Sequence, residues 1–275
     1  MHNLRFGTAG IPLSASGQNT MGGIAEVHRL GLEAMELEFV HSVNISPEGA
    51  KKVKAAKEEN EIELTCHAPY YINLAAIEKE KLEASIGRLV KAARIACLCG
   101  ARSVAVHPGF YLARDKSKVY LEIKNSLMQA LETLRQEGVK ITISPETMGK
   151  PTQFGSLEEI LKLSSELDGI MPCLDFAHLH AREGKINSKK EFCSVLEQVE
   201  KKLGSRAIKD LHIQVSGINY TEKGEKSHAA FNDSDFDLPG FLSALKQFDA
   251  AGIVICESPA MEKDALLLKN EFEAL

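Results

Sequence analysis

The sequence predicts a single-domain α/β protein with the fold of a (β/α)8 TIM barrel, and three observations support this prediction. Eight short β-type runs alternate with longer helical segments along residues 1–275. Because neighbouring parallel strands need crossover helices, this alternation is typical of a parallel sheet. Eight such units in a chain of this length match a closed barrel. The alternative is an open doubly wound sheet, but no GxGxxG motif follows the first strand.

The predicted strands are short runs rich in apolar and β-branched residues. They cover residues 4–8, 34–39, 62–67, 103–107, 140–144, 172–176, 210–215 and 253–257. The helical segments cover residues 49–60, 78–100, 118–138, 156–167, 189–204, 238–252 and 263–275. In segment 78–100, apolar residues recur at three- and four-residue intervals from Leu82 to Ile95, which indicates one buried helix face. Ser156, with Glu159 three residues later, predicts a capping box.

Composition and charge restrict the possible classes of function. The chain has 38 acidic and 33 basic residues, a net charge of −5, and 44% hydrophobic residues, which is enough for one sizeable core. Mild acidity excludes nucleic-acid binding by bulk charge alone and leaves open a local basic face. No apolar run reaches the ~18 residues of a membrane span, and we find no signal region. We therefore expect a cytoplasmic protein with no membrane partner, and we infer no obligate protein partner. The six cysteines show no paired zinc-ribbon spacing, so we expect reduced thiols.

Ionisable residues stand at or near the ends of six consecutive predicted strands, where a barrel builds its site. In strand order they are His67, His107, Glu146, Asp175, His212 and Glu257. Carboxylates gathered in one cavity without cations would repel one another and lose hydration. Mixed histidine and carboxylate ligands favour Zn²⁺, with Mn²⁺ as the other candidate. Glu146 is central in strand order and is predicted to bridge two ions, while His178 and His228 would hold a further ion.

Short motifs at these residues resemble the endonuclease IV family of apurinic/apyrimidinic (AP) DNA repair enzymes, which lies within the xylose-isomerase-like barrels. HAPYYINLA, residues 67–75, is similar to the family's His-x-x-Tyr-x-Ile-Asn-Leu signature after the third strand. The shorter matches are HPG at 107–109, PET at 145–147, CLDFAH at 173–178 and ESP at 257–259. The resemblance extends over nearly the whole chain.

This resemblance implies a zinc-dependent hydrolase that binds damaged double-stranded DNA and cleaves it 5′ to abasic sites in base excision repair. It implies a trinuclear zinc site, and for this chain we expect two or three zinc ions. The implied ligands, ion by ion, are His67, His107 and Glu146; then Glu146, Asp175, His212 and Glu257; and then His178 and His228. Glu146 and Glu257 would be catalytic, because they would fix the ions and orient the attacking hydroxide. Tyr70 and Tyr71 would bind DNA, on a loop that enters the minor groove.

The sequence departs from the family pattern at several positions. The family has an aspartate two residues before the histidine that corresponds to His228, and Lys226 stands there. Glu225 would substitute for that aspartate, or the Lys226 ammonium would replace one cation's charge beside a phosphate. The Asn-Asp pair that follows the seventh-strand histidine is absent, as is an arginine after the second strand. Lys185, Lys189 and Lys190, on the way out of the sixth strand, would contact backbone phosphates.

Two other functions stay open on the sequence alone. A sugar isomerase or epimerase of the same superfamily would use a four-ligand site of Glu146, Asp175, His212 and Glu257 around one Mn²⁺ or Co²⁺ ion. In that case the remaining histidines have less to do. The other possibility is a non-enzymatic barrel that binds nucleic acid or a partner. The number of metal ions bound per chain separates the three.

Overall fold

The structure is a computed structural model that describes residues 4–15 and 17–275, and its centre is an eight-stranded parallel sheet. The spatial order of its strands is β6-β4-β3-β2-β1-β12-β9-β8. Their bounds are β1 Leu4–Ala9, β2 Ala34–Glu38, β3 Glu63–His67, β4 Ser103–Val106, β6 Thr142–Pro145, β8 Cys173–Asp175, β9 Leu211–Val215 and β12 Gly252–Cys256. Two isolated parallel bridges, Ile143–Ile170 and Glu146–Cys173, link the two edges and nearly close the barrel. The predicted TIM-barrel fold is confirmed.

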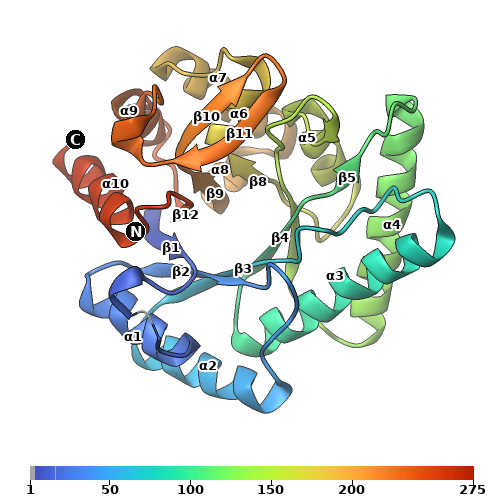
Figure 1. The fold of residues 1–275 in the computed structure, drawn as a ribbon, viewed down its shortest axis with the longest axis horizontal. Coiled ribbons are helices and arrows are strands. Elements are labelled where there is room, and N and C mark those ends of the chain that lie inside the picture. Colours follow the sequence, from blue (N-terminus) through green and yellow to red (C-terminus); the bar gives the residue numbers. More distant parts are fainter. Residues whose placement is uncertain (1–3, 16) are drawn as a thin grey trace.

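Helices surround this ring of strands (Figure 1). They are α1 Thr20–Arg29, α2 Pro47–Glu59, α3 Lys79–Cys99, α4 Lys116–Gln136, α5 Leu157–Glu166, α6 Phe176–Glu183, α7 Lys189–Leu203, α8 Ser205–Ile208, α9 Leu238–Gln247 and α10 Glu262–Ala274. The predicted capping box is present at the start of α5, between Ser156 and Glu159. Among the described helices, none combines the length and the apolar character that crossing a membrane requires.

The observed strands agree with the prediction in order and place, and the largest shift at a strand end is two residues, at the start of β6. A difference lies after β9, in residues 216–237, where the sequence predicts neither a strand nor a helix. The structure has a β-hairpin there, made of β10 Gly217–Thr221 and β11 Gly224–Ala229. Its residues are mostly polar, so no apolar alternation marks it in the sequence. A second short pair joins β5 Gly109–Phe110 and β7 Gln153–Phe154.

The strands are buried on both faces, because helices cover the outside and side chains fill the inside of the barrel. All five residues of β9 and all five of β12 are buried. The interior also holds polar groups, among which Glu36 and Gln214 are fully buried. A charged group survives there only with a partner, so these side chains must be satisfied within the barrel. All six cysteines are free, and five of them are buried.

Candidate metal centre

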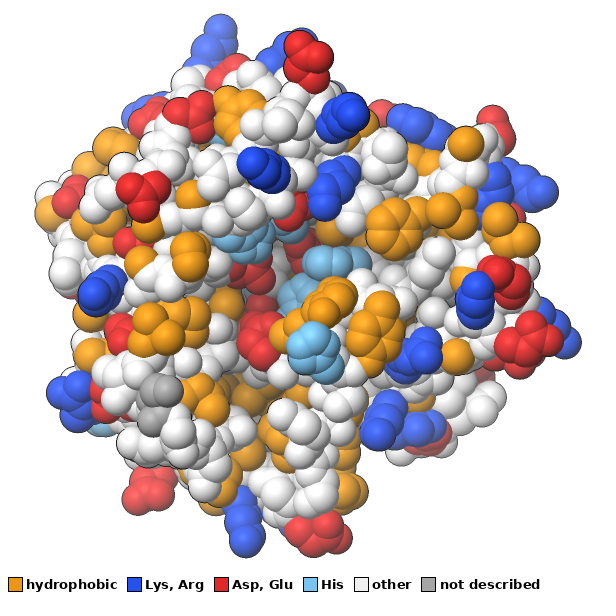
Figure 2. Space-filling view, in the orientation of Figure 1, with side chains coloured by type: hydrophobic (Ala, Val, Ile, Leu, Met, Phe, Trp, Pro, Cys, Tyr) orange, Lys and Arg blue, Asp and Glu red, His pale blue; other side chains and the backbone are white. Residues whose placement is uncertain are grey.

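A cavity of about 320 Å³ opens at the carboxyl ends of the strands. Its lining is rich in ionisable side chains: Glu38, His67, His107, Lys150, His178, Glu225, His228 and Glu257, with Val40, Tyr70, Met148 and Gln153. Figure 2 looks onto this face and shows histidine and acidic side chains at the bottom of a hollow, with lysine and arginine side chains around it. The structure therefore gathers residues from many strand ends into one place.

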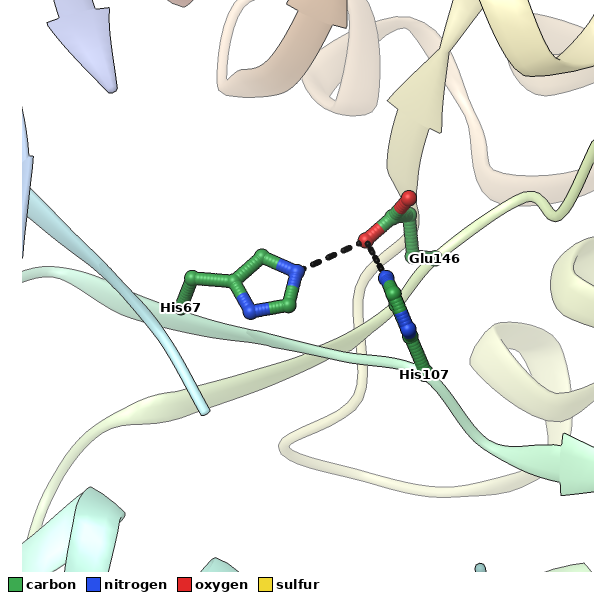
Figure 3. Close-up of side chains that lie close together, drawn as sticks. All are labelled: His67, His107 and Glu146. Atoms are coloured by element: carbon green, nitrogen blue, oxygen red, sulfur yellow. Dashed lines mark hydrogen bonds and ion pairs between the residues drawn. The ribbon is translucent and has the colours of Figure 1, made fainter. Parts of the chain in front are cut away.

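The first group of candidate ligands consists of His67, His107 and Glu146, whose ligand atoms all lie within 4.8 Å of one another. His67 ends β3, while His107 and Glu146 come directly after β4 and β6. Both imidazoles point their Nε2 atoms at Glu146 Oε2, at 3.1 Å from His67 and 3.2 Å from His107 (Figure 3). Two rings and a carboxylate thus converge on one point.

The His67 ring shows why this point calls for positive charge. Its Nδ1 lies 2.7 Å from the Ala68 carbonyl oxygen, which can only accept, so Nδ1 carries a hydrogen. A neutral His67 therefore turns an Nε2 lone pair toward a carboxylate oxygen. Without a metal, a proton takes this place: burial lowers the pKa of His67, but Glu146 raises it well above its usual value. Burial raises the pKa of Glu146, yet the neighbouring histidines, His107 foremost, hold it well below its usual range.

The second group consists of Asp175, His178 and His228, whose ligand atoms also lie within 4.8 Å of one another. Asp175 ends β8 and caps α6, because its Oδ1 accepts the His178 backbone N–H at 2.7 Å. The His178 and His228 rings both direct Nδ1 at a backbone carbonyl, that of Thr147 at 3.1 Å and that of Glu257 at 3.2 Å. Carbonyl anchoring of the second ring nitrogen is typical of metal-bound histidines.

This anchoring leaves the two Nε2 atoms facing each other at a distance of 3.3 Å. Two neutral rings in these tautomers would set lone pair against lone pair, which a shared cation relieves. Asp175 Oδ2 is also buried and accepts no hydrogen bond from any described residue, and burial raises the pKa of Asp175. The donor set and its unmet charge therefore fit a divalent ion such as Zn²⁺ or Mn²⁺.

Glu146 connects the two groups. Its Oε2 faces His67 and His107, and its Oε1 lies 2.9 Å from Nδ1 of His178. The sequence prediction that this carboxylate would bridge two ions stays a prediction, because Oε1 approaches the anchored Nδ1 of His178 and not the Nε2 that faces His228.

The two remaining predicted ligands belong to neither group within the described residues. Glu257 lines the cavity, with Oε2 3.9 Å from His228 Nδ1. Burial, followed by the charges of Asp175 and Glu146, raises the pKa of Glu257 well above its usual value.

His212 lies deeper, because its register partner in β8 is Cys173, whereas Asp175 pairs with Gln214. Its Nε2 is 3.0 Å from Glu36 Oε2, and its Nδ1 is 3.1 Å from Ser103 Oγ. The structure thus pairs His212 with Glu36 and Ser103, and neither group of candidate ligands among the described residues includes it.

Three further acidic residues lie at or below the centre. The sequence patterns do not identify Glu36 and Glu38 as site residues, and Glu225 enters there only as a substitute for the family's aspartate. Glu36 and Glu38 alternate in the buried strand β2, and a carboxylate in such a strand is itself a signal that a buried partner exists. Glu38 lines the cavity, and burial raises its pKa to about 8. Glu225 belongs to the hairpin, and its Oε2 is 3.4 Å from His178 Nε2.

Tyr70 and Tyr71 lie on the loop after β3, and both side chains are exposed, at 44% and 46%. Tyr70 lines the cavity, and its hydroxyl is 3.3 Å from His41 Nδ1. The Tyr71 ring is stacked under the Arg88 guanidinium, with 5.3 Å from the central carbon to the ring centre. Two open rings beside the cavity form a surface that a larger ligand can contact.

Fold and site together define the chain as a (β/α)8 barrel protein with a candidate metal centre at the carboxyl ends of its strands. The family model for the xylose isomerase-like TIM barrel matches residues 24–275, so the chain belongs to this family.

Relatives with similar sequences carry different names. An uncharacterized protein of Methanocaldococcus jannaschii is 46% identical over 273 residues, which cover 99% of this chain and 98% of that protein. A probable endonuclease 4 of Staphylococcus epidermidis is 27% identical over 251 residues, covering 85% of this chain and 81% of the relative.

Solved structures share the fold at low sequence identity. A D-tagatose 3-epimerase-like protein superposes with a TM-score of 0.76 at 18% identity, covering 98% of this chain and 96% of the other. Endonuclease IV from Thermus thermophilus superposes with a TM-score of 0.72 at 22% identity, covering 97% and 98%. These similarities establish the fold, and the type of reaction has to be argued from the site.

Proposed function

We propose that this chain is a zinc-dependent phosphodiesterase of the endonuclease IV type, which cleaves damaged double-stranded DNA 5′ to abasic sites. The similarity to a probable endonuclease 4 over most of both chains supports this proposal. So do the motifs around His67, His107, Glu146 and Asp175, whose side chains line or adjoin one cavity.

One observation carries the choice between a nuclease and a sugar isomerase. The candidate ligands that converge include His67, His107, His178 and His228, which the isomerase has little use for. The four-ligand isomerase site needs His212, whose Nε2 is engaged by Glu36 at 3.0 Å. The arrangement therefore favours a centre of more than one ion, which is a common design for phosphodiester cleavage.

The positions of the residues support the following roles. Divalent ions, when bound, lower the pKa of water and stabilise the charge that develops in phosphoryl transfer. His67, His107 and Glu146 would hold one ion, while Asp175, His178 and His228 would hold another, with Glu146 between them. Glu257, a carboxyl at the cavity wall with a raised pKa, would orient the attacking water.

DNA would lie across the mouth of the cavity. The exposed rings of Tyr70 and Tyr71 would wedge against an opened base step beside the abasic site. Lys150 lines the cavity, and Lys185, Lys189 and Lys190 are exposed after α6, so these ammonium groups would contact phosphates.

The test is incision of a duplex that carries one abasic site. Purified protein is freed of metal, reloaded with Zn²⁺, and compared with the same protein in chelator and on an undamaged duplex. We expect incision 5′ to the abasic site by the loaded protein. His107→Ala should abolish it, while His28→Ala, at an exposed position in α1, should leave it unchanged.

The metal count decides between the functions. Two or more ions per chain with incision support the nuclease. One ion per chain, with no incision at any metal loading, would reject it and favour the isomerase. No bound transition metal after loading would favour a binding module.

A further inference from the structure

The β10–β11 hairpin contains an irregularity at the position where the sequence departs from the family pattern. Ile218 pairs with His228, and Asn219 pairs with Ser227, but Tyr220 pairs with Glu225. One strand advances by one residue while the other advances by two. Lys226 is therefore the extra residue of a β-bulge, a feature that re-aims neighbouring side chains.

The bulge changes which side chains share a face of the hairpin. In a regular strand, Lys226 and His228 would point to one face and Glu225 to the other. In the structure, Lys226 and Ser227 are both exposed, whereas the side chains of Glu225 and His228 are only 17% and 28% exposed. Glu225 and His228 both line the cavity. The bulge thus brings a carboxylate to the centre and turns the ammonium away from its interior.

The contacts of Glu225 fit a metal ligand. For metal–ligand bonds of about 2.0–2.1 Å, the ligand atoms of a tetrahedral site stand about 3.3 Å apart. The Nε2 atoms of His178 and His228 are 3.3 Å apart, and His178 Nε2 is 3.4 Å from Glu225 Oε2. Two edges of a tetrahedron are therefore already formed. Asp175 is the remaining member of the group; its buried Oδ2 accepts no hydrogen bond from any described residue and lies 3.4 Å from His178 Nδ1.

Two glycines allow the hairpin to reach this position. A Cβ on Gly149 would lie 2.7 Å from Glu225 Cβ and 3.0 Å from His178 Cδ2. A Cβ on Gly224 would lie 2.3 Å from the Gly149 carbonyl oxygen. The Glu225 N–H donates to that same oxygen at 3.0 Å. The loop after β6 and the hairpin therefore approach each other closely beside Glu225, and the absence of a Cβ at both glycines permits this approach.

We propose that Glu225 is the fourth protein ligand of the ion held by Asp175, His178 and His228, and that the bulge at Lys226 places it there. This inference rests on the proposed function for the second group of ligands. The chain would close this site with a glutamate three residues before His228, and Lys226 would take no part in binding the ion.

The test counts metal and does not depend on catalysis. Wild type, Glu225→Ala, Glu225→Gln, Lys226→Ala and His228→Ala are loaded with Zn²⁺, desalted, and analysed for zinc per chain and for Zn²⁺ affinity against a chelator. Co²⁺ absorption spectra report the ligand set. We expect both Glu225 variants to lose one ion, or to bind it at least tenfold more weakly, while Lys226→Ala matches wild type. Circular dichroism checks that each variant is folded, and the isosteric Glu225→Gln keeps the packing.

Two further variants make the result decisive. The double variant Glu225→Ala/His228→Ala should lose no more zinc than His228→Ala alone, since both act on one ion. Glu225→Ala/Lys226→Asp should not recover the ion, because position 226 faces away from the cavity. Wild-type zinc content and affinity in both Glu225 variants, or loss of the ion in Lys226→Ala, would overturn the inference and leave the proposed function standing. A wild type that binds no ion would overturn both, as would a single ion whose binding neither His228→Ala nor the Glu225 variants weaken, with no incision.

Discussion

Replacing His212 by alanine tests whether this residue is a ligand of the metal centre or the partner of a buried carboxylate. Glu36 is fully buried, and its Oε2 lies 3.0 Å from His212 Nε2. Burial raises the pKa of Glu36, but the charge and hydrogen bond of His212 bring it below its usual value, so the carboxylate is ionised. The variant leaves this carboxylate without the imidazole that faces Oε2, although Oε1 still accepts from Gln214 Nε2 at 2.7 Å.

The expected cost follows from the position of this pair. Removal of one partner of a buried ion pair costs about 3–5 kcal/mol, and we expect about 3 kcal/mol because one hydrogen bond remains. Urea unfolding at pH 7 in chelator measures this in the metal-free protein, and elemental analysis counts zinc in the loaded protein. The double variant Glu36→Gln/His212→Ala removes the stranded charge and should be more stable than His212→Ala. A His212→Ala protein of wild-type stability that has lost a zinc ion would refute the reasoning.

Three other predictions concern the centre and its rim. In the metal-free protein, the pKa values of His67 and His178 are raised well above their usual value. The two protonated rings therefore stabilise the folded state fully below the unfolded pKa of about 6.5, and this stabilisation is lost as pH rises through the folded pKa values. Thermal unfolding should therefore show stability falling from pH 6 to 8 in chelator, and Zn²⁺ should reverse the trend, with proton release on binding measured by calorimetry. Gly149→Ala should weaken zinc binding at the second group, because its Cβ would lie 2.7 Å from that of Glu225; Gly87→Ala, whose Cβ would meet nothing within 4 Å, is the matched control. Tyr70→Ala should weaken binding to an abasic duplex by about 5- to 150-fold at unchanged zinc content, the range for loss of one aromatic stack, while Tyr70→Phe should bind like wild type. Wild-type affinity in Tyr70→Ala would remove the tyrosine from the DNA contact.

The sequence was sufficient for the fold because the barrel repeats one strong local pattern. Each unit carries a short apolar strand and a longer amphipathic helix, so eight strands could be placed within two residues of their observed ends. The positions of His67, His107 and Glu146 followed from the rule that strand ends meet at one mouth of the barrel.

Depth within the barrel and local register could not be predicted in the same way. His212 and Gln214 lie on the same face of β9, which points into the barrel. Only the stagger of neighbouring strands decides that Gln214, and not His212, pairs with Asp175. Glu225 was weighed as a substitute on adjacency alone. A single extra residue in a hairpin decides its direction, and a mostly polar hairpin carries no apolar alternation from which that residue could be located.

The ring of strands has one weak seam, and the centre sits on it. β6 and β8 meet through two isolated bridges, and Glu146 and Asp175 flank this seam on opposite sides. Ions bound by the two groups would link residues that follow β6 to residues that end β8. Metal loading should therefore slow amide hydrogen exchange along β6 and β8 more than along β1 and β2. If the proposed ions bind there, the metal-free barrel should be easier to open and hence easier for proteases to cleave.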